Sequence, residues 1–140
     1  MKFYDRILHA EKTLEPFRSE YVVAYEDVDQ ETCSIMIPTP EAMAQLMHGG
    51  VFPPVWVYWE LAKDEAQPNF ERHHRMHLLD ETPREDSKTE KEAIEYLIMK
   101  DVPQHIWRNY QNSNSVNMKI CKRKQLPKSR EFRDAWRIAA

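Results

Sequence analysis

The sequence predicts an α+β domain in which a small, mostly antiparallel sheet of about three strands packs with four or five helices. Three observations favour this class. Three short segments have the composition or alternation of strands, and several longer segments carry helix signals. The 140 residues include nine prolines but only two glycines, Gly49 and Gly50. This length suits one domain, so we expect a single domain over residues 1–140.

The first elements are predicted to be a helix and a β-hairpin. Residues 2–18 have apolar side chains at helical spacing, and Pro16 ends the helix. The expected apolar face consists of Phe3, Ile7, Leu8 and Leu14. Segments 21–25 and 33–37 follow, both rich in β-formers and separated by a polar turn. Such neighbours are expected to pair as antiparallel strands.

The next two elements are predicted to be helices around the glycine pair. Thr39 is a suitable N-cap, Pro40 falls at the first helical position, and Gly49 stands where a C-terminal cap belongs. A second helix is expected to run from Pro53 to about Ala66. If Gly49 has a positive φ, its replacement by alanine should cost about 1 kcal/mol or more.

The remaining elements follow an almost wholly polar segment. Residues 82–91 lack a hydrophobic pattern and predict a mobile loop. The capping box at 89–92 then starts a helix that ends near Lys100. Residues 116–120 alternate strictly between apolar and polar side chains, which predicts a half-buried strand. Ser129 is expected to cap a final amphipathic helix.

Charge is distributed unevenly along the chain. Residues 1–113 hold 12 Lys/Arg and 21 Asp/Glu, whereas residues 114–140 hold eight and two, so a basic C-terminal segment follows an acidic body. Such a segment is suited to phosphate contacts. Its candidate nucleic-acid-binding residues are Lys119, Lys122, Arg123, Lys124, Lys128, Arg130 and Arg133. The alternative is that the basic segment folds back onto the acidic body.

An aromatic cluster follows the glycine pair and predicts a protein interface. Its members are Phe52, Trp56, Tyr58 and Trp59. Aromatic side chains dominate the binding energy of many protein interfaces. The alternative is that these side chains fill the core, as aromatic residues commonly do.

The sequence holds one candidate metal site and no candidate catalytic residue. His73 and His77 are four residues apart, so on a helix both would lie on one face and suit a divalent ion. No third ligand stands at a diagnostic spacing, and the alternative is a solvated, ion-paired face. Cys33 and Cys121 are far apart and predict buried free thiols in a reducing compartment. One Gly-Gly pair excludes dinucleotide fingerprints and P-loops, so no cofactor is predicted.

Two C-terminal motifs resemble a group of small uncharacterised bacteriophage proteins. These are Lys-Asp-Val-Pro at 100–103 and the run from Leu126 to Trp136, with Pro127, Arg130, Phe132, Arg133 and Ala135 at the positions of the family pattern. Ser129 stands where the family usually has Asp, and both residues are good N-caps. The resemblance implies phage origin and no established activity.

From these observations we expect a non-enzymatic phage accessory protein that acts by binding another protein, of the host or of the phage. The alternatives are a nucleic-acid-binding accessory protein and a small metal-dependent enzyme. The longest apolar run, 51–59, is less than half a membrane span, so no membrane association is expected. The charged N-terminal residues do not fit a secretion signal, which favours the cytoplasm of the host cell.

Overall fold

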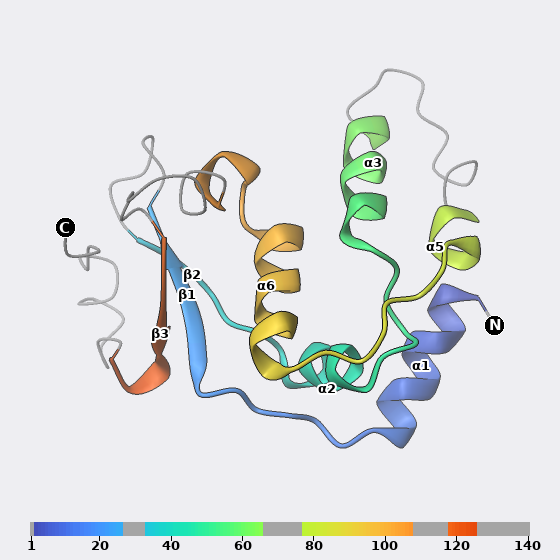
Figure 1. The fold of residues 1–140 in the computed structure, drawn as a ribbon, viewed down its shortest axis with the longest axis horizontal. Helices are drawn as coiled ribbons and strands as arrows, with labels where there is room; N and C mark the ends of the chain where they lie inside the picture. The colour runs from blue at the N-terminus through green and yellow to red at the C-terminus, as the bar shows by residue number, and fades with distance from the viewer. Residues whose placement is uncertain (1, 27–32, 66–76, 108–117, 126–140) are drawn as a thin grey trace. The chain divides into compact units, whose positions relative to one another are not determined.

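The computed structural model describes residues 2–26, 33–65, 77–107 and 118–125, and it confirms the α+β class (Figure 1). These residues form helices and one three-stranded antiparallel sheet. The chain groups into two compact units, residues 1–17 with 39–96 and residues 18–38 with 97–140. The expectation of a single domain stays a prediction.

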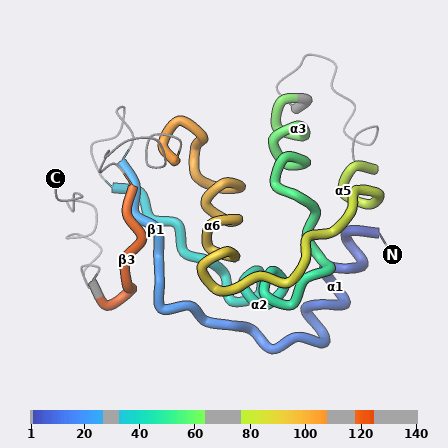
Figure 2. The backbone as a smooth tube through the Cα atoms, viewed as in Figure 1, coloured from blue at the N-terminus to red at the C-terminus, as the bar shows by residue number. Residues whose placement is uncertain are grey.

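The first unit is helical (Figure 2). Its elements are α1 (Phe3–Thr13), α2 (Pro40–His48), α3 (Val55–Glu65), α5 (His77–Glu81) and the first half of α6 (Glu90–Asp101). Its buried hydrophobic residues include Ala10, Met43, Leu46, Val51, Phe52, Val57, Leu79, Ala93, Ile94 and Tyr96. Each of the four complete helices places at least one residue in this core.

Helix α1 is shorter than predicted, and its buried face is different. It ends at Thr13, before Pro16, and the amide of Leu14 still donates to the carbonyl of Ala10 at 2.9 Å. The expected apolar face is only partly buried, because Leu8 is 37% exposed. The buried positions of α1 are Arg6 and Ala10. A charged side chain therefore occupies the place that the apolar pattern assigned to hydrophobic residues.

Helix α2 has both predicted caps. The Thr39 hydroxyl accepts from the amide of Ala42 at 3.3 Å, and Pro40 opens the helix. Gly49 follows the last turn with φ 85° and ψ 167°, and its amide donates to the carbonyl of Gln45 at 3.0 Å. These local signals set both ends of α2.

The segment expected to be a mobile loop, 82–91, is hydrogen-bonded to the rest of the first unit. The amide of Glu85 donates to the carbonyl of Phe52 at 2.8 Å, and the amide of Gly50 donates to the carbonyl of Glu85 at 2.9 Å. Residues 90 and 91 belong to α6. A polar composition is thus compatible with a hydrogen-bonded backbone, and the mobility of this segment stays a prediction.

Helix α6 begins with the predicted capping box. The Thr89 hydroxyl accepts from the amide of Glu92 at 3.1 Å, and a Glu92 carboxylate oxygen accepts from the amide of Thr89 at 3.0 Å. The backbone hydrogen bond from Thr89 to this carboxylate lowers the pKa of Glu92 most, and a side-chain hydrogen bond from Thr89 lowers it further, because both favour the ionised form. The helix ends at Asp101, one residue beyond the predicted end.

The second unit contains the sheet, whose strand order is β2-β1-β3. The strands are β1 (Tyr21–Tyr25), β2 (Ser34–Met36) and β3 (Met118–Lys122). The predicted hairpin is confirmed by antiparallel pairing of β1 with β2, in which Tyr25 faces Ser34. Its polar turn lies outside the described residues. The central strand β1 is fully buried at three successive positions, 22–24.

Strand β3 lies two residues later than predicted. It starts at Met118, and its partner β1 sets the register, with Val22 opposite Cys121 and Tyr25 opposite Met118. A short 3-10 helix, η1 (Arg123–Gln125), follows. The buried residues of this unit include Val22, Val23, Ala24, Leu97, Ile98, Val102, Ile106, Trp107, Met118 and Cys121. The expected final helix from Ser129 lies outside the described residues.

Candidate functional site

The aromatic cluster divides into a core residue and a surface residue. Phe52 is buried, with its ring centroid 6.2 Å from that of Phe3 and 5.9 Å from that of Tyr96. The prediction that Phe52 belongs to an interface is therefore wrong, because its ring packs in the core of the first unit. Trp56, in contrast, is 45% exposed.

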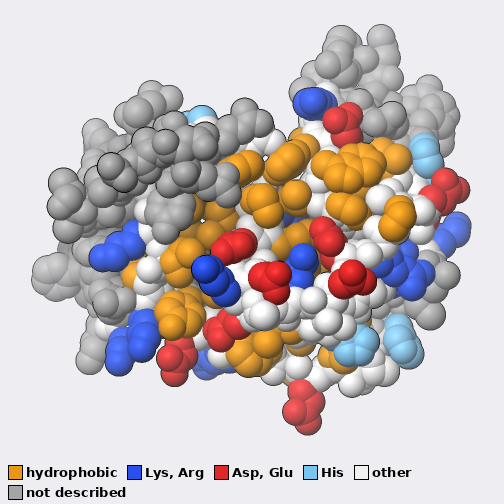
Figure 3. Space-filling model, viewed as in Figure 1, with side chains coloured by type: hydrophobic (Ala, Val, Ile, Leu, Met, Phe, Trp, Pro, Cys, Tyr) orange, Lys and Arg blue, Asp and Glu red, His pale blue; other side chains and the backbone are white. Residues whose placement is uncertain are grey.

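Helix α3 holds Trp56 at the surface. Val57, the next residue, is completely buried and fixes α3 in the first unit, so the neighbouring position turns outward. Tyr58 and Trp59 are half-buried. Figure 3 shows hydrophobic side chains gathered over α3 on the face toward the viewer. The exposed part of the predicted aromatic surface is thus centred on Trp56.

Part of the predicted basic cluster lines one hollow of about 260 Å³ in the second unit. Lys122, Arg123 and Lys124 contribute from β3 and η1, and Arg18 joins them from the segment before β1. Glu20 is the acidic residue of this lining. No sequence signal points to Arg18, because it lies outside the basic segment and the pairing of β1 with β3 brings it there.

Arg123 has a structural role within this basic hollow. Its Nε donates to the carbonyl of Ser19 at 3.0 Å, and its amide donates to the carbonyl of Glu20 at 2.7 Å. Lys119 is exposed on β3. The other predicted nucleic-acid-binding residues, Lys128, Arg130 and Arg133, lie outside the described residues.

The candidate metal ligands are only partly described. His77 is the exposed first residue of α5, and His73 lies outside the described residues. Within the described ranges, no group of three or more His, Cys, Asp or Glu side chains is arranged to hold a metal ion. The metal site remains a sequence-based prediction.

Both cysteines are buried free thiols, as the sequence predicts. The thiol of Cys33 lies 3.5 Å from the carbonyl oxygen of Tyr25. Burial raises the pKa of the Cys121 thiol, and nearby Lys119 partly opposes the effect. A thiol that is less ionised at neutral pH is a poorer nucleophile. These properties fit packing residues.

No pattern in the sequence indicates that Arg6 is buried, yet this residue is only 3% exposed. Its Nε donates to the carbonyl of Val51 at 3.0 Å, and one terminal nitrogen donates to the carbonyl of Leu79 at 2.8 Å. The other terminal nitrogen lies 3.4 Å from the carbonyl oxygen of Asp80. Arg6 therefore ties α1 to α5 and to the turn after α2.

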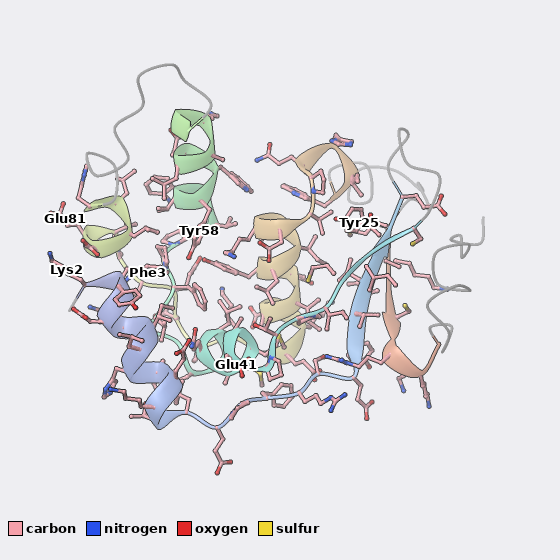
Figure 4. The ribbon with its side chains drawn as sticks, turned by 180° about the vertical axis from the view of Figure 1, so that it is seen from behind. Lys2, Phe3, Tyr25, Glu41, Tyr58 and Glu81 are labelled. Atoms are coloured by element: carbon pink, nitrogen blue, oxygen red, sulfur yellow. The ribbon has the colours of Figure 1, made fainter. Side chains whose placement is uncertain are left out.

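The same junction includes the first turn of α1. The amide of Phe3 donates to a carboxylate oxygen of Asp80 at 2.9 Å, which places a negative charge at the N-terminus of α1. Figure 4 shows Phe3 beside α5, whose last residue, Glu81, is labelled. The Arg6 guanidinium also lies 5.5 Å from the centroid of the Phe3 ring. The first two turns of α1 thus provide donors for the Asp80 carboxylate and for the carbonyls of Val51 and Leu79.

Comparison with known proteins gives no relative, because no family model, no curated protein and no solved structure matches this chain. None of the described helices combines the length and apolar character that crossing a membrane requires.

Proposed function

We propose that this protein is a non-enzymatic accessory protein that binds another protein through α3, with the indole of Trp56 as its anchor. The observation that carries the proposal is the exposure of Trp56 beside the completely buried Val57. A helix fixed by its buried side presents the indole without further rearrangement. Tryptophan is among the residues enriched in interface hot spots.

The surroundings of Trp56 suggest the chemistry of the partner. Half-buried Trp59, one helical turn from Trp56, extends the hydrophobic surface, while Glu60 and Lys63 form an ion pair at 3.7 Å on the same helix. An apolar centre with a charged edge is the usual composition of a protein interface. The expected partner surface therefore contains an apolar pocket that accepts an indole ring.

The resemblance to small phage proteins supports a biological setting for this interaction. In that setting the protein works in the cytoplasm of an infected host cell, and its partner is a host or phage protein. An acidic chain with an exposed tryptophan is compatible with this setting.

The test compares Trp56→Ala with Tyr4→Ala in quantitative pull-downs from host cells. Tyr4 is a matched control because it is a 71% exposed aromatic residue on a different helix, α1. Both variants should unfold at the wild-type temperature. We expect one partner to be retained by wild type and Tyr4→Ala and lost with Trp56→Ala. Its purified form should bind Trp56→Ala about thirtyfold more weakly, equivalent to a hot spot of about 2 kcal/mol. Equal retention by all three proteins would refute the role of Trp56.

The basic hollow of the second unit supports a second candidate function, binding to nucleic acid. The lining gathers four cationic side chains, and Arg18 adds to the charge that the sequence concentrates in 114–140. Cationic side chains arranged around one hollow are suited to contact neighbouring phosphates. Glu20 at the same hollow lowers the net positive charge by one.

Binding of labelled duplex DNA and single-stranded RNA over a series of salt concentrations tests this candidate. The variant Lys122→Glu/Lys124→Glu removes two cations and leaves the structural Arg123 in place. The control Lys12→Glu/Lys91→Glu makes the same charge change on exposed lysines of the first unit. We expect the first variant to weaken binding and to reduce the salt slope by about two, and the control to do neither. Equal losses in both variants would mean that net charge alone governs binding.

A further inference from the structure

A second hollow, of about 320 Å³, lies in the first unit. Its walls come from α1, the C-terminal end of α2, the two glycines and the segment before α6. Four side chains of its lining carry a positive charge or can acquire one, namely Arg6, His9, His48 and Arg84. None of the ten described residues that line it is acidic, although the chain contains 23 Asp and Glu.

Two guanidinium groups act on one another at this hollow. Burial lowers the pKa of Arg6 most, and the charge of Arg84 lowers it further. Asp80 and Tyr58 act in the opposite direction, and each has less effect than Arg84. The carbonyl partners of Arg6 accept its hydrogen bonds but carry no net charge. The two guanidinium groups therefore bring positive charge to the hollow, where an anion would interact favourably with both.

The histidines add directional donors. His9 and His48 both line the hollow, from α1 and from the end of α2. The Nδ1 atom of His48 lies 2.9 Å from the carbonyl oxygen of Gly49. Since a carbonyl only accepts, Nδ1 carries the proton in this contact and Nε2 is the ring nitrogen left for a ligand. An oxyanion at Nε2 favours the imidazolium, in which both nitrogens donate.

From this arrangement we infer that the first unit binds a small oxyanion, phosphate or a phosphate monoester. Arg84, His9 and His48 supply the hydrogen-bond donors, and Arg6 supplies a fixed positive charge behind them. The volume lies near the lower end of the range for small-molecule pockets, about 300–1,000 Å³, which leaves room beside the phosphate for a small organic group. This inference is independent of the protein interface on α3.

Calorimetric titration of the full chain tests the site with inorganic phosphate, glycerol phosphate and acetate as probes, at constant ionic strength held with sodium chloride. The variants are Arg84→Gln and His48→Gln, both at exposed positions. Lys12→Gln is the matched control, because Lys12 is an exposed cation of α1 that does not line the hollow. Thermal unfolding without phosphate verifies that every variant folds.

We expect saturable binding of phosphate by wild type and Lys12→Gln, with affinity at least tenfold lower in Arg84→Gln and in His48→Gln. Binding of glycerol phosphate at least as tight as phosphate identifies a monoester as the ligand class, and binding of phosphate alone identifies the free ion. The inference is overturned if neither phosphate compound binds saturably, if acetate binds as tightly as phosphate, or if both site variants bind like the control.

Discussion

Gly49→Ala is the sharpest test of how the first unit is built. The backbone of Gly49 has φ 85° and ψ 167°, a combination that is essentially confined to glycine. A Cβ atom at this position would lie against the backbone nitrogen of Ser87 and 2.9 Å from the carbonyl carbon of Asp86. The substitution therefore both strains the end of α2 and pushes away the segment that leads into α6.

The neighbouring glycine provides the magnitude and the control. Gly50 also has a positive φ, 78°, but no atom lies within 4 Å of a Cβ built on it. Gly50→Ala should then show only the conformational penalty, about 1–2 kcal/mol. Gly49→Ala carries a penalty of about 1–3 kcal/mol for its backbone region, together with the clash against 86–87. We expect its total loss to be about 3 kcal/mol or more.

Urea unfolding of wild type and both alanine variants measures these losses as changes in midpoint at a constant m-value. The amide hydrogen of Glu85, which is donated to the carbonyl of Phe52, should also exchange with solvent faster in Gly49→Ala, because it belongs to the displaced segment. The reasoning is refuted if Gly49→Ala is within about 0.5 kcal/mol of wild type, which is the range of a neutral surface substitution. A larger loss in Gly50→Ala than in Gly49→Ala would refute it equally.

Four further predictions concern buried or capping groups. Arg6→Met should destabilise the protein by about 3 kcal/mol or more, because it leaves buried carbonyls without donors, and Arg6→Lys should recover only part of the loss in urea unfolding. Thr89→Ala should cost about 1 kcal/mol, since it removes one side of the capping box. The lowered pKa of Glu92 means that its stabilising effect is present above the ordinary carboxyl pKa and lost as pH falls through the lowered pKa. In Glu92→Gln the free energy of unfolding should therefore fall less steeply than in wild type as the pH is lowered into the acid range. Cys121 should react with iodoacetamide far more slowly than free cysteine at neutral pH, and rapid labelling of the folded protein would contradict its burial.

The ends of α2 and α6 were predictable because their signals are local. Thr39 and Gly49 bracket α2, and each makes its capping contact within four residues along the chain. Thr89 and Glu92 do the same at the start of α6. Contacts of this range depend on neighbouring residue types alone, so a single sequence contains the information. The antiparallel hairpin of β1 and β2 was predictable for the same reason, because its two strands are neighbours in the sequence.

The position of Arg6 was not predictable, because its partners are distant in sequence. The carbonyls of Val51, Leu79 and Asp80 lie 45 to 74 residues further along the chain. Every residue has a backbone carbonyl, so no pattern of side chains in the sequence indicates which carbonyls accept hydrogen bonds from Arg6. Helical periodicity instead favoured Leu8, which is exposed. Arg18 at the basic hollow was missed for the same reason, since strand pairing brought it there.

The aromatic cluster shows how a local break separates residues that the sequence groups together. The ring of Phe52 is buried in the core, and the Phe52 carbonyl accepts from the amide of Glu85 in the 82–89 segment. Two prolines then follow Phe52 before α3 begins. Helix α3 starts only at Val55, and its phase is set by the buried Val57. Trp56 therefore faces outward although only three residues separate it from Phe52. Spacing within the cluster was uninformative, because the helix had not begun at its first member.

The two proposed sites of the first unit differ in how closely ligand binding is linked to the stability of the fold. Trp56 acts through an exposed surface, so its replacement should leave stability unchanged and alter only partner binding. The oxyanion hollow is built against Arg6, whose hydrogen bonds hold α1 to α5, so stability and ligand binding are coupled there. Phosphate that binds the folded protein should raise its unfolding temperature by mass action. At the same phosphate concentration that rise should persist in Trp56→Ala and be clearly smaller in Arg84→Gln, because the two sites depend on different elements.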